Sequence, residues 1–268
     1  MTPYAFINGA IVPAQDAQIN IGDIGLLRGY GVFDFFRVID GKPIFLNDYL
    51  DRFERSVAGL HLNIPYSRDY LTENIYEIIA LNPHPLLGIK LLCTGGYATD
   101  GYTPTEPNVC MLANPFKFHP YAEGLKLITV EYQRDLHHIK SLNYLKPISL
   151  IPQMKSIEAD DVLYHTSGFI SESSRSNIFM VKNKVLITPS EGILEGVTRK
   201  RIIAFAPEIM PVEVRQITVD ELQSADEIFL TASTKRISPV TAIDDKTFES
   251  GAYTKILYER LLVEESEK

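Results

Sequence analysis

The sequence predicts an α+β fold made of two α/β domains with mostly antiparallel sheets. Short apolar stretches bounded by glycine, proline or asparagine recur along the 268 residues and indicate strands. Longer stretches with an apolar residue at every third or fourth position indicate helices. Residues 114–124 contain two prolines and end in a glycine, which is typical of a linker. We therefore expect an N-terminal domain at 1–113 and a C-terminal domain at 125–268.

The N-terminal domain is expected to begin with a hairpin whose turn is Asn8-Gly9. Glycines at 22, 25, 29 and 31 then indicate a loop that leads into a buried strand. Asn47 has a side chain that can cap the helix after it. The strands expected here are 4–7, 10–13, 32–39, 43–46, 86–94 and 108–114, and the helices are 48–60 and 68–81.

The C-terminal domain is expected to alternate short strands with helices. Its strands are predicted at 125–131, at three places between 161 and 188, near 212–218 and near 227–231. Its helices are predicted at about 142–156, at 197–206 and at about 253–265. The last acidic residues, Glu264, Glu265 and Glu267, are expected to form a solvated chain end.

Composition narrows the class of protein. A net charge of −8 argues against nucleic acid or an anionic membrane as a partner. Cys93 and Cys110 do not form a CxxC pair, so we expect no metal site and a reducing compartment. The first residues do not have the pattern of a signal peptide, and no stretch approaches membrane-spanning length. A cytoplasmic protein is expected.

Two motifs in the second half carry the chemistry. Glu172-Ser-Ser-Arg-Ser-Asn177 places a carboxylate at the end of an apolar strand, just before a polar turn. Leu194-Glu-Gly196-Val197-Thr198-Arg199 places a small, hydroxyl-bearing turn at the start of a helix, where backbone N–H groups bind anions. A phosphorylated heterocyclic cofactor needs both a buried acid and an anion-binding helix end.

The order and spacing of these motifs resemble the signature of class IV aminotransferases, the fold-type IV enzymes that use pyridoxal 5′-phosphate. The resemblance extends over nearly the whole chain, from Asn8-Gly9 to Ile237-Ser-Pro-Val240. It implies that the chain is a transaminase acting on amino acids and 2-oxo acids, and that it forms a homodimer.

The resemblance also implies two catalytic residues. A pyridoxal enzyme holds its cofactor through an imine to a lysine whose amine is partly desolvated or lies near other cations. Lys140, in Ile139-Lys140-Ser-Leu-Asn, falls on the cofactor lysine of the family. Glu172 falls on the glutamate that keeps the pyridine nitrogen protonated, so that the ring accepts electrons from the substrate.

The remaining cofactor contacts follow from the same resemblance. The phosphate is expected to bind Val197 and Thr198 at the helix start, Ser233-Thr234 after a strand, and Arg52. Tyr144 could reach the oxygen of the cofactor ring. No metal ligand is expected.

The side of the pocket that contacts the substrate is predicted on the strand at 32–39. Phe33, Phe35 and Arg37 alternate along it and would point one way. Branched-chain L-amino-acid transaminases usually have a glycine where this chain has Phe35, so bulk there would narrow the pocket for an aliphatic side chain.

A guanidinium is the expected partner of the substrate carboxylate, because its planar group can donate two parallel hydrogen bonds to it. D-amino-acid transaminases usually supply an Arg-x-His element, but the loop at 95–102 contains neither residue. Tyr97 of this loop is expected to contact the substrate. Arg28, just before Gly29-Tyr30-Gly31, is the candidate, with Lys235 or Arg236 as possible helpers.

The favoured function is a D-amino-acid transaminase, because Tyr30-Gly-Val-Phe-Asp and Ile139-Lys140-Ser-Leu-Asn resemble that branch. Two alternatives share the scaffold, a branched-chain L-amino-acid transaminase and a 4-amino-4-deoxychorismate lyase. Outside this class, the chain could be an inactive binding protein that kept the fold.

Overall fold

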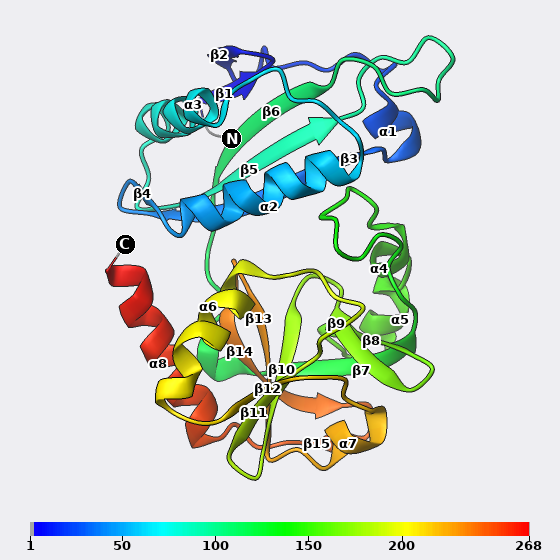
Figure 1. Cartoon of the computed structure of the whole chain (residues 1–268), viewed down its shortest axis with the longest axis vertical. Helices are drawn as coiled ribbons and strands as arrows, with labels where there is room; N and C mark the ends of the chain where they lie inside the picture. The colour runs from blue at the N-terminus through cyan, green and yellow to red at the C-terminus, as the bar shows by residue number, and fades with distance from the viewer. Residues whose placement is uncertain (1–2, 268) are drawn as a thin grey trace. The chain divides into compact units, whose positions relative to one another are not determined.

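The computed structural model describes residues 3–267, whose contacts divide them into two units (Figure 1). The first unit extends to Lys117 and also includes the short segment Ile139–Asn143. The second unit consists of Phe118–His138 and Tyr144–Glu267. No helix within residues 3–267 is both long and apolar enough to cross a membrane.

The first unit is a six-stranded antiparallel sheet with three helices. The strand order is β2-β1-β6-β5-β3-β4, and β3 pairs with β5 along its full length. Phe36 and Val38 of β3 and Leu50 and Phe53 of α2 are fully buried, so α2 covers β3 with an apolar face (Figure 1). The elements are β1 (Tyr4–Ile7), β2 (Ala10–Pro13), α1 (Ile24–Arg28), β3 (Gly31–Ile39), β4 (Lys42–Pro43), α2 (Leu46–Gly59), α3 (Arg68–Leu81), β5 (Leu86–Thr94) and β6 (Asn108–Pro115).

The second unit contains a nine-stranded mixed sheet. The main path is β12-β11-β10-β13-β14-β7-β8-β9, and β9 also pairs with β10, so strands β10 to β9 along this path form a closed ring. Three pairings are parallel: β11–β12, β7–β14 and β7–β8. The strands are β7 (Leu125–Glu131), β8 (Asp161–Thr166), β9 (Phe169–Ser173), β10 (Asn177–Lys182), β11 (Val185–Thr188), β12 (Val212–Val214), β13 (Glu227–Ala232), β14 (Arg236–Ile243) and β15 (Lys246–Thr247).

Short helices lie around this sheet, and a longer one ends the unit. They are η1 (Tyr121–Glu123), α4 (Leu145–Ser149), α5 (Ile151–Ser156), α6 (Val197–Phe205), η2 (Ala206–Glu208), α7 (Val219–Gln223) and α8 (Ala252–Ser266). The mixture of helices with largely antiparallel sheets confirms the predicted α+β class.

Several local predictions need correction. Residues 161–188 form four strands rather than three, the strand expected at 43–46 is only Lys42–Pro43, and β14 was not predicted. The helix expected at 142–156 is two short helices, α4 and α5, since Pro147 and Pro152 lack the N–H that a continuous helix would need. The glycine-rich loop contains α1, whose first turn is capped by the Asp23 carboxylate on the N–H of Gly25. Asn47 lies inside α2, which begins at Leu46 after a left-handed Phe45 and has no side-chain cap.

The acidic end of the chain is not a solvated tail. Glu264 and Glu265 lie in the last turn of α8. Glu265 is buried, and Arg236 of β14 donates to its carboxylate from both Nε (2.8 Å) and Nη2 (2.7 Å). Glu264 pairs with Arg260 one turn earlier, at 2.7 Å. The Arg236–Glu265 ion pair attaches the end of α8 to β14, whereas the Arg260–Glu264 pair lies within α8.

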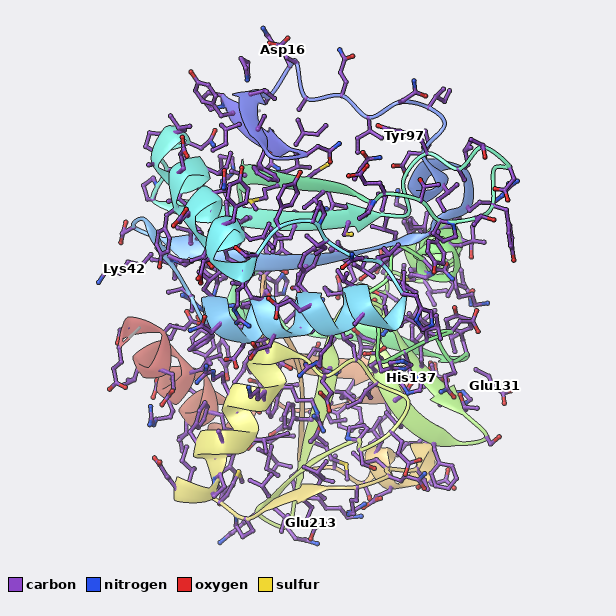
Figure 2. The ribbon with its side chains drawn as sticks, turned by 45° about the horizontal axis from the view of Figure 1, so that its top comes forward. Asp16, Lys42, Tyr97, Glu131, His137 and Glu213 are labelled. Carbon is purple, nitrogen blue, oxygen red and sulfur yellow. The ribbon has the colours of Figure 1, made fainter. Side chains whose placement is uncertain are left out.

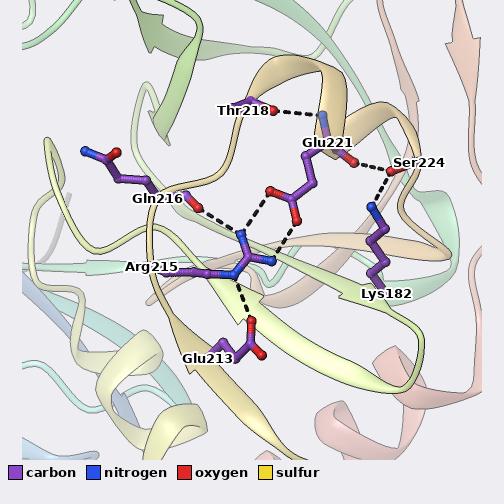
Figure 3. A network of polar contacts seen from close by, with 7 residues as sticks. All are labelled: Lys182, Glu213, Arg215, Gln216, Thr218, Glu221 and Ser224. Atoms are coloured by element: carbon purple, nitrogen blue, oxygen red, sulfur yellow. Dashed lines mark hydrogen bonds and ion pairs between the residues drawn. The ribbon is translucent and has the colours of Figure 1, made fainter.

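A polar network joins β12 to α7 (Figure 3). Arg215 donates to both carboxylate oxygens of Glu221, at 2.9 and 2.6 Å, and to Glu213 at 2.7 Å. Thr218 caps α7 by accepting from the N–H of Glu221. The hydrogen bonds to Glu221 and Glu213 raise the pKa of the Arg215 guanidinium and lower the pKa of the Glu221 carboxyl.

Candidate active site

The backbone of Lys140 is attached to the first unit. The Phe33 N–H of β3 donates to the Lys140 carbonyl at 2.9 Å, and the Leu142 N–H donates to the Gly31 carbonyl at 2.9 Å. From the other side, the Lys140 N–H donates to the Ser56 hydroxyl of α2 at 3.2 Å. Because of these bonds, Lys140 is carried by the first unit, whereas the sequence had placed it in the C-terminal domain.

The amine of Lys140 lies over an aromatic ring. Its Nζ is 4.6 Å from the centre of the Phe33 ring, within the range of a cation–π contact. Lys90 approaches the same ring, with its Nζ at 5.7 Å. The Lys140 side chain is half-buried. The predicted cofactor lysine and one predicted substrate contact, Phe33, are therefore neighbours.

Arg52 is held in a buried ion pair. Its Nε donates to Asp34 Oδ2 at 2.9 Å and its Nη2 to Asp34 Oδ1 at 2.6 Å, which is the bidentate geometry of strong arginine–carboxylate pairs. The Asp34 carboxylate is fully buried. Asp34 therefore fixes the direction of the guanidinium that the sequence assigned to the phosphate.

Glu172 is buried and held by two donors. Arg134 Nε donates to one carboxylate oxygen at 2.8 Å, and the Leu194 N–H donates to the other at 2.9 Å. A second nitrogen of Arg134, Nη2, donates to the His137 carbonyl. Glu172 pairs with Asn177 across β9 and β10, so the carboxylate has a fixed place beside the turn that leads to α6.

The turn before α6 is held closely by Asn177. The Asn177 amide donates to the Leu194 carbonyl at 2.8 Å, and a Cβ at Gly196 would come within 2.0 Å of Asn177 Oδ1. Only glycine fits this close approach. Gly196 is the N-cap of α6 and makes no side-chain cap, so the N–H groups of the first turn remain available to an anion.

Thr198 supplies the test of whether this helix end suits a phosphate. Its side chain is 2% exposed, and its Oγ1 has no hydrogen-bond partner within residues 3–267. A buried hydroxyl without a partner carries a desolvation cost, so such groups in native proteins call for an explanation. A phosphate oxygen bound at the start of α6 would give the hydroxyl a partner, and the residues present fit a phosphorylated cofactor.

Ser233 and Thr234 lie on the turn between β13 and β14. The next residue, Lys235, is directed to Asp161 Oδ2 at 3.4 Å and Ser176 Oγ at 3.3 Å. Burial lowers the pKa of the Lys235 amine, and Asp161 opposes this shift. Lys235 and Arg236 both have carboxylate partners, which makes them weaker candidates for the substrate carboxylate.

Arg28 is the exposed last residue of α1, and its Nη1 lies 3.4 Å from the carbonyl of its neighbour Leu27. Its helix is anchored by buried Asp23, which accepts from the hydroxyl of Thr94 and the amide of Asn108, both at 2.6 Å. Tyr97 lies in the loop between β5 and β6 (Figure 2), where its hydroxyl accepts from the Asn20 N–H at 3.2 Å.

The two other residues predicted on β3 differ in accessibility. Phe35 is half-buried, packs edge-on against Phe116 with ring centres 5.8 Å apart, and lies where a Cβ at Gly88 would be. Arg37 is completely buried, with its guanidinium carbon 6.0 Å from the centre of the Phe45 ring. Arg37 is thus a poorer substrate contact than Phe33 or Phe35.

A pocket of about 650 Å³ lies in the second unit, but none of the predicted site residues lines it. His137 (labelled in Figure 2) and the buried Arg199 are part of its wall. Burial and the neighbouring His138 lower the pKa of His137. Tyr144, the last predicted cofactor contact, is half-buried at the N-cap of α4 rather than inside a helix.

Three partners of the site were not identified from the sequence: Arg134 for Glu172, Asp34 for Arg52, and Ser56 for Lys140. Each is far along the chain from the residue it holds. For Asp34 the sequence does contain a signal, a charged residue within an apolar strand. Such a residue is expected to be buried and therefore to need a charged partner, and Asp34 is indeed buried.

Comparisons with known proteins agree on one family. The amino-transferase class IV family pattern matches residues 31–243. A candidate branched-chain-amino-acid aminotransferase of Methanocaldococcus jannaschii is 33% identical over 270 residues, covering 95% of this chain and 94% of its own. A D-alanine aminotransferase of Staphylococcus epidermidis is 30% identical over 256 residues, covering 92% and 91%.

The solved structures give the same result. The branched-chain aminotransferase of the thermophilic archaeon Thermoproteus uzoniensis, with norvaline, has a TM-score of 0.90 and 26% identity, covering 100% of this chain and 97% of that one. Another solved branched-chain amino acid aminotransferase, with pyridoxamine 5′-phosphate, has a TM-score of 0.93 and 25% identity. The predicted family, transaminase class and cofactor are confirmed. The chain belongs to the class IV aminotransferases and is a pyridoxal 5′-phosphate-dependent transaminase.

Proposed function

We propose that this transaminase exchanges amino groups between D-amino acids and 2-oxo acids, with Lys140 as the cofactor lysine and Glu172 as the acid at the ring nitrogen. The observation that carries the substrate preference is the packing of Phe35. Its ring lies on Gly88 and against Phe116, so its bulk is fixed where branched-chain enzymes usually have a glycine.

The residues divide the work of the reaction. Bound pyridoxal 5′-phosphate supplies a ring that accepts electrons from the substrate Cα. The Lys140 amine accepts the proton from that Cα and later returns a proton, as a positioned general base and acid. The Glu172 carboxylate, oriented by Arg134 and the Leu194 N–H, accepts a hydrogen bond from the ring nitrogen.

The phosphate contacts would act as an anchor for this chemistry. The start of α6, with Val197 and Thr198, supplies backbone N–H groups and a hydroxyl. Ser233 and Thr234 supply two more hydroxyls, and Arg52 supplies positive charge. Tyr144 would donate to the oxygen of the ring.

A branched-chain L-amino-acid transaminase is the second candidate function. It is favoured by the match to the archaeal relative, whose 33% identity slightly exceeds the 30% of the D-alanine enzyme. The absence of the Arg-x-His element of the D-type loop between residues 95 and 102 points the same way. A 4-amino-4-deoxychorismate lyase would be distinguished from both by its products.

We also propose that the enzyme acts in a reducing compartment, the cytoplasm. Cys93 and Cys110 lie in neighbouring strands, β5 and β6, as free buried thiols. Burial raises the pKa of the Cys93 thiol to about 12 and that of Cys110 to about 11, which keeps both protonated and unreactive.

A panel of substrates tests the proposed function. We expect the wild type to convert D-alanine and D-glutamate with pyruvate or 2-oxoglutarate far faster than L-leucine or L-valine. Lys140→Ala should abolish turnover and the visible absorbance of the bound cofactor, because the covalent attachment point is lost. Chiral chromatography of the products measures the preference.

The outcomes of this panel separate the candidates. Faster conversion of L-leucine would support the branched-chain function instead. Release of pyruvate from aminodeoxychorismate without transamination would identify a lyase. A colourless protein that takes up no added cofactor would contradict both the transaminase and the role of Lys140.

Arg28 is proposed to bind the substrate carboxylate. Arg28→Ala should raise the KM for amino acids about tenfold or more, because a charge-assisted hydrogen bond to the substrate carboxylate is lost. The KM for primary amines that have no carboxylate should be unchanged. Steady-state kinetics with an amino acid and a matched primary amine measures the difference. Arg55→Ala, which changes an exposed arginine of α2, is the control. Equal effects on both substrates would contradict the proposal.

Thr198 is proposed to bind the cofactor phosphate. Thr198→Val keeps the volume of the side chain and removes the hydroxyl, so we expect affinity for pyridoxal 5′-phosphate to fall about tenfold. Affinity for pyridoxal, which has no phosphate, should be unchanged. Equilibrium dialysis of the apo-enzyme measures both, with the exposed Thr247→Val as control. Parallel loss for the two compounds would argue against a phosphate contact.

We propose a homodimer as the working form. Leu145 and Ile148 of α4 are 79% and 61% exposed, and exposed apolar side chains on one helix are typical of an interface. Leu145→Glu with Ile148→Glu should shift the sedimentation mass from two chains to one, because two charges would have to be buried. A wild type that sediments as a single chain would contradict this.

A further inference from the structure

We propose that Ser56 and Gly59, on one face of α2, set the position of Lys140, and that Ser56 is a positioning residue for attachment of the cofactor. The inference rests on the proposed role of Lys140 as the cofactor lysine. It concerns the protein groups that hold this lysine, which lie on an element distant from it in sequence.

Three residues of α2 form one stripe along the helix, meaning that they share one side of it. Arg52, Ser56 and Gly59 are spaced four and three residues apart, so they lie on the same side of the helix. Arg52 is fixed at one end of the stripe by its two hydrogen bonds to buried Asp34 of β3. The stripe therefore has a fixed register against β3, the strand that pairs with the Lys140 segment.

Ser56 provides a side-chain hydrogen-bond acceptor for the backbone of Lys140. Its side chain is 1% exposed, and its Oγ accepts the Lys140 N–H at 3.2 Å. Without the hydroxyl, the partly buried Lys140 N–H would lose this hydrogen bond to α2.

Gly59 provides room for the residue before the lysine. A Cβ at this position would lie 2.7 Å from Cδ1 and 3.0 Å from Cγ1 of Ile139. Ile139 is 1% exposed, so its side chain has little space to move away. Glycine is a poor residue for a helix, and this close approach gives a reason for its presence in α2.

β3 holds the opposite side of the same segment. The Phe33 N–H and the Gly31 carbonyl bond to the backbone of Lys140 and Leu142, and Val32 forms a β-bridge with Ser141. The lysine backbone is thus bound on two sides, by a strand and by a helix. A long, flexible lysine side chain gains most from such a fixed base, since correct placement of a reacting group contributes much of its rate.

The experiment measures covalent attachment of the cofactor directly. Apo-enzyme prepared from the holoenzyme is mixed with pyridoxal 5′-phosphate, and the visible absorbance is followed against time at several pH values. Borohydride reduction and mass analysis identify the modified lysine. Thermal unfolding of each apo-variant gives its Tm.

Ser56→Ala should slow attachment about fivefold, the effect of one lost hydrogen bond, and shift the pH dependence of the rate. Gly59→Ala should slow attachment to a similar degree while the Tm stays or rises, because alanine favours a helix. Adding Ile139→Val to Gly59→Ala removes the Cδ1 methyl and should restore the rate. Thr72→Ala, which removes a hydroxyl bonded to Arg68 of α3, should leave attachment unchanged.

Two results would overturn the inference while the proposed function stands. The first is a Ser56→Ala variant that attaches the cofactor with the rate and pH profile of the wild type. The second is a Gly59→Ala variant whose slower attachment accompanies a lower Tm and is not restored by Ile139→Val. If Ser56→Ala does not fold, the Gly59 and Ile139 variants decide alone. Attachment at a lysine other than Lys140 in the wild type would overturn both the inference and the proposed role of Lys140.

Discussion

The hydrogen bonds that attach Ile139–Asn143 to β3 and α2 are the constraint on which the proposed chemistry depends. The chain enters this segment from the second unit and returns to it afterwards, so the five residues stay in the first unit only through their own contacts. Backbone groups that leave water must find partners, and Lys140 finds them for both its N–H and its carbonyl. The pair Asp34–Arg52 fixes the two elements that provide these partners. Removing one member of such a buried pair typically costs about 3–5 kcal/mol, because the other charge is left uncompensated.

In the second unit, too, hydrogen bonds from distant residues fix the groups of the site, here an acid and the start of a helix that can bind an anion. The Glu172 carboxylate accepts hydrogen bonds from a guanidinium and a backbone N–H, and Asn177 attaches the neighbouring turn to the sheet. The closed ring of strands makes these positions rigid, since each strand from β10 to β9 has a partner on both sides. Thr198 is one of several buried hydroxyls in this unit that no described group satisfies, and it lies in the first turn of α6. An unsatisfied hydroxyl at a helix start, beside free backbone N–H groups, is well suited to bind a phosphate.

Much of the fold could be predicted because most elements have a strong local pattern. The strands 86–94 and 125–131 and the helix 68–81 have the predicted bounds, and α8 differs from its prediction by one residue at each end. Several of the errors occur where a single residue overrides the pattern. Pro147 and Pro152 interrupt an otherwise helical stretch, and Asp23 starts a helix in a stretch that four glycines had marked as a loop. Glu265 was predicted exposed because its partner, Arg236, is far away in the sequence.

The site could be predicted as chemistry but not as geometry. Lys140, Glu172 and Thr198 belong to motifs whose residues are close in sequence, so the resemblance of these motifs to those of class IV aminotransferases indicated the cofactor class. Ser56, Asp34 and Arg134 act across 84, 18 and 38 positions, and no local pattern indicates such pairs. The residues proposed to determine substrate preference also depend on contacts between residues that are far apart in sequence. Phe35 narrows its surroundings only because Gly88 and Phe116 hold it, and Arg28 has a fixed place only because Asp23 joins α1 to the ends of two distant strands. Overall sequence similarity does not distinguish the two candidates, since the branched-chain and D-alanine relatives match this chain at 33% and 30% identity.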